Sequence, residues 1–135
     1  NKKEGDQKTP KGTFEIDKLY FRKDRIKKPI TLLKCVEINK TMGWCDDINF
    51  LEKYNKLIKV NKKIRHEKLK RKDSKYDLLI PIKYNFNKPI ANLGSCIFIH
   101  LTEDYRPTAG CIALKKKDFL IMLKLIKKNS KIKIF

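Results

Sequence analysis

The sequence predicts a mostly β domain with one clear helix in its C-terminal half. Three observations favour this class: the chain has many short apolar or alternating segments, turn residues separate them, and one segment has helical periodicity. A chain of 135 residues can bury a core without disulfides. We therefore expect one domain over residues 1–135, in which short additional helical segments accompany the strands.

The expected helix runs from Lys115 to Lys128, where apolar side chains fall on one broad side and lysines on the other. Asp118 lies in its first turn and Lys127-Lys128 in its last, as the helix dipole favours. Asn129-Ser130 should end the helix. The alternating segment Lys131–Phe135 then predicts a return to a sheet.

Several β-favouring segments precede this helix, and we expect strands within Thr13–Ile16, Ile30–Ile38, Tyr76–Tyr84 and Ser95–Leu101. Pro81 suggests that the third of these is an edge strand or carries a bulge. The segment Met42–Asp47 is typical of a loop or a short edge strand.

The net charge of +19 makes nucleic acid or an anionic surface a candidate partner. However, the lysines are spread over the whole length beside many Asn and Ile residues, which indicates a compositional bias rather than a basic patch. No zinc-finger, helix-turn-helix or RNA-binding motif is visible, so we expect no specific nucleic-acid partner. No apolar run approaches the ~20 residues of a transmembrane helix.

The cysteine pattern does not predict a metal site. The four cysteines form no C-x-x-C pair, and the chain has only two histidines. Cys35 and Cys96 lie in or beside apolar runs and are most simply interpreted as small buried hydrophobic residues. Four cysteines allow three disulfide pairings, all of which remain open.

The strongest indication of chemistry is the pair formed by His100 and Cys111. An apolar run ends on His100, and a loop with Gly110 then leads to Cys111. An imidazole can take the proton of a thiol, so this pattern suits a cysteine nucleophile with its base. In that case Cys111 should react with alkylating agents at a pH well below the pKa of a free thiol. The alternative is that both residues are structural.

Ordered blocks of the chain resemble a known family. They are Glu4–Phe14, Trp44–Asp47 with Tyr54-Asn55, His66–Leu69 with Tyr76–Leu78, and Ile97–His100 through Pro107–Leu114. In order and spacing they resemble a divergent branch of the L,D-transpeptidase catalytic domain, also called the YkuD family. The resemblance covers nearly the whole chain. It implies a β-sandwich or barrel of the L,D-transpeptidase type, and a single catalytic domain over 1–135 that lacks its N-terminal start.

The resemblance also implies roles for four residues. Cys111 would be the nucleophile and His100 its general base. The backbone carbonyl of Leu101 would orient the imidazole, while Gly110 and the amide of Cys111 would lie at the oxyanion site. His66, Arg106 and Thr108 are the expected substrate-binding residues; for His66 alone, a solvated surface position is an equally open interpretation.

Two features depart from the family pattern. A histidine is common between the Ser/Thr and the Gly of the motif, and Ala109 stands there in this chain. The interval between His100 and Cys111 is also shorter than usual.

The implied activity is that of a peptidoglycan L,D-transpeptidase, which forms 3→3 crosslinks between stem peptides through a cysteine acyl-enzyme. An L,D-carboxypeptidase of the same fold and a non-catalytic module that binds the cell wall are the alternatives. We expect no cofactor, no metal and a monomer whose partners are peptidoglycan stem peptides. The resemblance places it in the bacterial cell envelope, periplasmic or exported.

Overall fold

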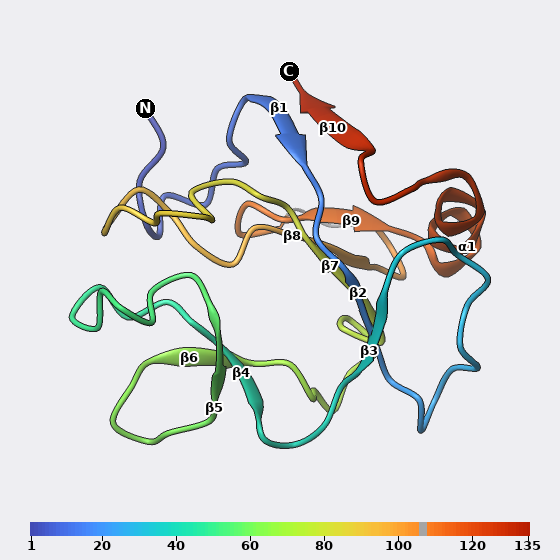
Figure 1. Cartoon of the computed structure of the whole chain (residues 1–135), viewed down its shortest axis with the longest axis horizontal. Coiled ribbons are helices and arrows are strands. Elements are labelled where there is room, and N and C mark those ends of the chain that lie inside the picture. The colour runs from blue at the N-terminus through green and yellow to red at the C-terminus, as the bar shows by residue number, and fades with distance from the viewer. Residues whose placement is uncertain (106–107) are drawn as a thin grey trace.

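A five-stranded mixed sheet lies at the centre of the molecule (Figure 1). The computed structural model describes residues 1–105 and 108–135. The outer strand pairs of this sheet are parallel and the inner pairs antiparallel. In spatial order its strands are β3 (Cys35–Glu37), β2 (Leu19–Phe21), β7 (Leu78–Pro81), β8 (Phe98–Leu101) and β9 (Ile112–Leu114).

Two smaller sheets flank the central one. β1 (Gly12–Glu15) pairs antiparallel with β10 (Lys131–Ile134), which joins the two ends of the chain. β4 (Met42–Cys45) lies between β5 (Leu57–Lys59) and β6 (His66–Lys68) in a three-stranded antiparallel sheet. Figure 1 shows these two small sheets on opposite sides of the central strands.

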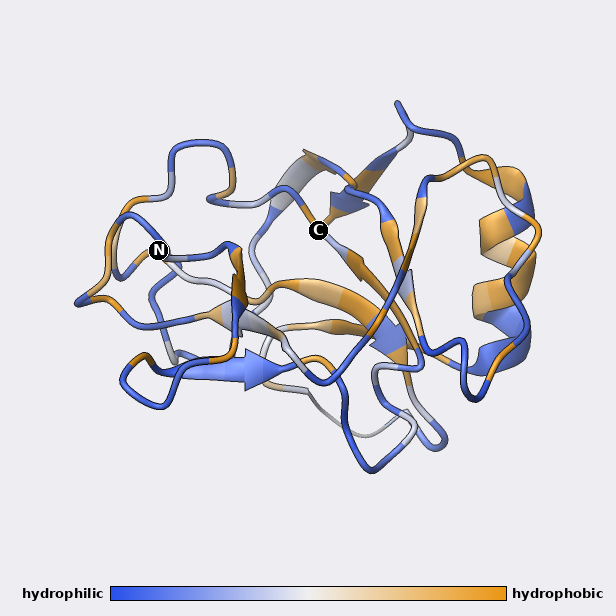
Figure 2. Ribbon diagram, turned by 60° about the horizontal axis from the view of Figure 1, so that its bottom comes forward, coloured by the Kyte–Doolittle hydropathy of each residue, from blue (hydrophilic) through white to orange (hydrophobic). Residues whose placement is uncertain are grey.

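Both faces of the central sheet are buried, because each inner strand sends alternate side chains into two separate hydrophobic clusters. In β8, for example, Ile99 and Leu101 point into one cluster and Phe98 into the other. The first cluster includes α1 (Lys116–Leu125), and we call it the helix-side cluster. The second contains Trp44, Tyr76 and Phe98, and we call it the aromatic cluster. Figure 2 shows the apolar residues concentrated along the central strands and on part of α1.

The helix covers the sheet with a narrow apolar stripe. Phe119 and Leu123, one turn apart, are its buried residues and both belong to the helix-side cluster. Asp118 lies in the first turn and Lys124 in the last. The backbone N–H of Ile126 donates to the carbonyl oxygen of Met122 and closes the C-terminal turn, at 3.1 Å.

Most of the expected elements are confirmed. Lys131–Ile134 returns to a sheet by pairing with β1. The helix forms within the predicted range but ends at Leu125, because Ile126 is already extended. Lys127-Lys128 therefore follow the helix instead of forming its last turn, and Asn129-Ser130 do not end it. The structure also corrects the expectation of further helical segments, because the part of the chain that it describes holds α1 as its sole helix. The segments in which further helices were expected form turns instead. In one of them, the backbone N–H groups of Lys53 and Tyr54 both donate to the carbonyl oxygen of Phe50.

Two segments for which an edge position was one of the expectations form central strands. β4 is the middle strand of its sheet rather than a loop or an edge, because it pairs with β5 and β6 on its two sides. β7 is the middle strand of the five-stranded sheet. Pro81 is tolerated there because it is the last residue of β7, and a proline at a strand end removes little of the ladder.

We expect the packing of α1 to depend on Phe119, whose side chain is fully buried, and not on Ile121, which is 50% exposed. Phe119→Ala should reduce the free energy of unfolding by about 3 to 5 kcal/mol, because it leaves a cavity in the helix-side cluster. Ile121→Ala on the same helix is the matched control and should change it by less than ~0.5 kcal/mol. Urea unfolding measures both; equal losses would contradict this packing.

Candidate active site

His100 is a polar residue that strand alternation places in an apolar face. It lies on β8 beside Phe98, on the side of the aromatic cluster, and its side chain is 2% exposed. Its Nδ1 lies 2.8 Å from the backbone carbonyl oxygen of Leu101. A carbonyl oxygen can only accept a hydrogen bond, so Nδ1 carries the proton and Nε2 keeps a free lone pair.

The environment keeps this imidazole neutral. Burial lowers the pKa of His100 to about 4, and the nearby charges of Lys75 and Arg71 act in the same direction. Among the residues that the structure describes, Nε2 is a buried nitrogen without a hydrogen-bond partner. His100 therefore offers an unengaged base, held in one tautomer by Leu101.

Cys111 lies on the same face of the sheet as His100. β9 runs parallel to β8, and His100 pairs with Ala113 in register, so Cys111 stands two residues earlier on the same side. Its side chain packs against the aromatic cluster. In this state its Sγ donates to the backbone carbonyl oxygen of Cys96 at 3.2 Å, and not to His100 Nε2.

The thiol of Cys111 is protonated in this environment. Burial raises its pKa to about 11, although a backbone hydrogen bond from Phe98 acts in the opposite direction. The sequence analysis expected Cys111 to ionise at a pH well below the pKa of a free thiol. The raised pKa argues against this expectation, because burial disfavours the charged thiolate. A neutral thiol and a neutral imidazole face the same cluster.

Gly110 allows the loop before Cys111 to pass close to the N-terminal segment. Its φ is +113°, and a Cβ at this position would stand 2.7 Å from the carbonyl oxygen of Lys8. The hydroxyl of Thr108 donates to the carbonyl oxygen of Cys111 at 2.5 Å. Thr108 therefore stabilises the turn between residues 108 and 111. Arg106, the other residue of this loop expected to bind substrate, lies outside the described residues.

A pocket of about 260 Å³ opens at the thiol. Cys96 and Cys111 line it together with Tyr76. The three carboxylates among its lining residues, Glu4, Asp46 and Glu67, outnumber the two lysines, Lys2 and Lys75. Carboxylates thus gather at this pocket although the whole chain carries +19, and two of them have arginine partners: Asp46 with Arg65 at 3.1 Å and Glu67 with Arg71 at 3.8 Å.

Sequence reasoning missed Tyr76 and Glu67 as parts of the site. The Tyr76 hydroxyl donates to Glu67 Oε1 at 2.9 Å, and its ring packs against that of His100 with centroids 5.7 Å apart. Burial, followed by the charge of Glu67, raises the pKa of Tyr76 well above its usual value, so the hydroxyl remains a donor. Neighbouring residues of a strand point to opposite faces, but β6 reads His66-Glu67-Lys68 and has no apolar residue that would show which face Glu67 takes.

The structure does not bring His66 to this pocket. His66 precedes Glu67 on β6 and points to the other face, where its ring lies over Gly43. Its Nδ1 lies 2.7 Å from the carbonyl oxygen of Ile64. Glu67, rather than His66, therefore faces the thiol.

The four cysteines are free, so none of the three disulfide pairings is present. Cys35 and Cys96 are half-buried against the helix-side and aromatic clusters, respectively. Burial raises the pKa of Cys96 well above that of an ordinary thiol. Within residues 1–105 and 108–135, no group of three or more His, Cys, Asp or Glu side chains is placed to hold a metal ion.

We expect His100 to make the fold acid-sensitive. Its pKa is about 4 in the folded chain against 6.5 in the unfolded one, so the unfolded state binds the proton first as the pH falls below 6.5. The stability lost between pH 6.5 and 4 should be about 3 kcal/mol. Urea unfolding of the wild type and His100→Gln at pH 7 and pH 4.5 tests this, and an equal loss in both proteins would contradict it.

The geometry can be compared with known proteins. No curated protein and no solved structure matches the chain. The model of the L,D-transpeptidase catalytic domain (YkuD) matches residues 1–134. The described part of the chain contains no helix long and apolar enough to cross a membrane. Since the family match spans essentially the whole chain and the fold is mostly β, the chain belongs to the L,D-transpeptidase catalytic domain family.

Proposed function

We propose that this chain is a peptidoglycan L,D-transpeptidase in which Cys111 is the nucleophile and His100 its general base. The observation that carries this proposal is the unengaged Nε2 of His100, which lies on the same sheet face as Cys111 while Leu101 fixes the tautomer. The match of the family to residues 1–134 supports the same reaction class. The whole of residues 1–135 would act as one catalytic domain.

In the first step the Cys111 sulfur attacks the carbonyl carbon at the L-centre of the third residue of a donor tetrapeptide stem. His100 Nε2 takes the thiol proton as the C–S bond forms. Burial disfavours the charged form of both groups, so we propose that the proton moves from the thiol to Nε2 during the attack. The amides of Gly110 and Cys111 would stabilise the oxyanion.

In the second half of the reaction the terminal D-alanine leaves with the proton held by His100, and a thioester remains on Cys111. The amine of a second stem attacks this thioester and gives up a proton to His100. The thiol is restored and a 3→3 crosslink forms. Water in place of the amine would give L,D-carboxypeptidase activity.

The charges around the thiol suit such a substrate. Glu4, Asp46 and Glu67 line the pocket, and carboxylates attract the ammonium group of a diamino acid at the third position of a stem. Thr108 is proposed to support the substrate by holding the turn, and Arg106 to contact a stem carboxylate. We propose that the protein acts as a monomer in the bacterial envelope, with no metal or cofactor.

The assignment of the two residues can be tested with purified tetrapeptide muropeptides. The wild type should release D-alanine and form 3→3 dimers, both detected by mass spectrometry. Cys111→Ser should abolish both products, and His100→Gln should slow them by about 10² to 10⁴-fold. Cys35→Ser is the control, since Cys35 packs against the helix-side cluster and away from this pocket.

Other results of this assay would favour a different assignment or function. Products from Cys111→Ser would place the nucleophile elsewhere. D-alanine release without dimers would indicate a carboxypeptidase. Sedimentation with sacculi and no turnover would indicate a non-catalytic module that binds the wall.

The protonation state of the resting thiol gives a separate prediction. Since the pKa of Cys111 is raised from 9.0 to about 11, its alkylation by iodoacetamide should still be rising with pH at pH 10. At pH 7 the thiolate population should be ~100-fold below that of an ordinary thiol. Peptide mass spectrometry at Cys111 across pH 6 to 10 measures the profile, and a plateau near neutrality would show a preformed thiolate–imidazolium pair.

A further inference from the structure

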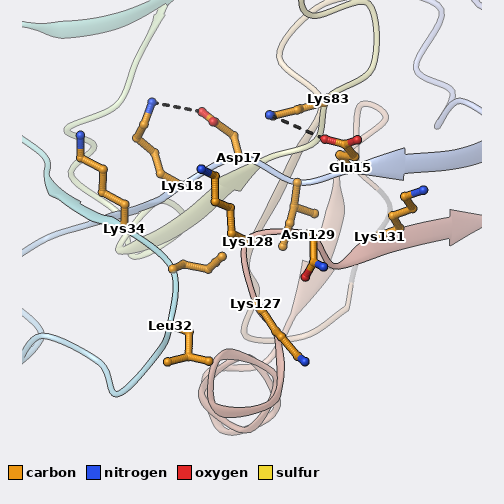
Figure 3. A pocket seen from close by; sticks show the side chains of 12 residues that line it. Glu15, Asp17, Lys18, Leu32, Lys34, Lys83, Lys127, Lys128, Asn129 and Lys131 are labelled. Atoms are coloured by element: carbon orange, nitrogen blue, oxygen red, sulfur yellow. Dashed lines mark ion pairs between the residues drawn. The ribbon is translucent and has the colours of Figure 1, made fainter.

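A larger pocket, of about 1080 Å³, lies away from the thiol and shares none of its lining residues (Figure 3). Its walls come from four segments: the end of β1 with the residues after it, the segment before β3, Lys83 after β7, and the chain from the end of α1 to the start of β10. Six of its lining side chains are lysines: Lys18, Lys34, Lys83, Lys127, Lys128 and Lys131.

The charge of this pocket is strongly positive. The carboxylates that line it are Glu15 and Asp17, and each already has a lysine partner: Lys83 at 3.9 Å and Lys18 at 3.6 Å. Figure 3 shows these pairs and the remaining lysines around the same opening. The other four lysines are exposed. An anionic partner would therefore meet cations that the pocket's own acids do not neutralise.

One exposed apolar side chain lines this pocket, and two more lie two residues along the chain from residues that line it. Leu32 lines the pocket and is 75% exposed, and Ile30, two residues earlier, is 78% exposed. Leu125, at the end of α1 and two residues before Lys127, is 75% exposed. Large exposed aliphatic residues among cations are typical of surfaces that insert into the headgroup boundary of a membrane.

A water-soluble polyanion would use only the charged part of this surface. It would pair with the lysines and leave Leu32, Ile30 and Leu125 in water. An anionic bilayer satisfies both halves, because its headgroups pair with ammonium groups while its upper acyl region receives the aliphatic side chains.

We propose that the surface formed by Ile30, Leu32, Leu125, Lys34, Lys127 and Lys128 binds an anionic lipid bilayer. We call it the lysine-leucine surface. It would hold the domain at a membrane without a spanning helix, and it does not depend on the chemistry at Cys111.

The test uses vesicles of phosphatidylcholine with and without phosphatidylglycerol, and measures co-sedimentation of the full chain. The wild type should bind only the anionic vesicles, less strongly as salt rises. Lys127→Glu/Lys128→Glu should weaken binding by at least about tenfold, since each lysine near an anionic surface is worth about fivefold. Leu32→Ser/Leu125→Ser should also weaken binding, although it changes no charge.

The matched control is Lys62→Glu/Lys63→Glu. It changes the net charge equally on the exposed connection between β5 and β6, and should alter binding by less than about twofold. All the substituted side chains are exposed, and unchanged urea midpoints would confirm that the variants fold. An equal effect of the control would show that overall charge causes the binding. Unchanged binding of the leucine variant, or no binding of anionic vesicles, would also overturn the proposal.

Discussion

The burial of β8 on both faces is the constraint on which the site depends. Ile99 and Leu101 lie in the helix-side cluster, and Phe98 lies in the aromatic cluster. A shift of one residue in register would exchange the two sets, so both clusters fix the position of the strand. The same alternation leaves His100 no choice of face, because it must follow Phe98 into the aromatic cluster.

This position has a chemical consequence for His100. An imidazole in an apolar cluster loses the hydration that would stabilise its charged form, and its pKa falls to about 4. The carbonyl oxygen of Leu101 satisfies Nδ1, but Nε2 remains a buried nitrogen without a partner among the described residues. Buried polar atoms are rarely left unpaired, so this nitrogen is an exception that calls for an explanation. Parallel pairing of β9 with β8 then brings Cys111 to that face.

The sequence predicted the parts of the structure that local patterns determine. Apolar runs gave the buried strands, and helical periodicity gave α1. Pairing could not be deduced in the same way: β4 was expected as a loop or an edge strand and β7 as an edge strand or a bulged one, although partners flank both on two sides. Polar β6 has no apolar alternation to set its phase, which is why His66 was chosen and Glu67 was missed. The raised pKa of Cys111 was also beyond the sequence, because it arises from burial by distant segments.

The lysines show the same limit most clearly. Along the chain they are evenly spread, and their number indicated only a compositional bias. The fold nevertheless gathers six of them from four separate segments around one pocket, and it gathers Glu4, Asp46 and Glu67 at the thiol. Fields from exposed charges are screened within about 8 Å in physiological salt, so each pocket presents its own charge to a partner. A protein of net charge +19 can thus present carboxylates at one pocket and lysines at another.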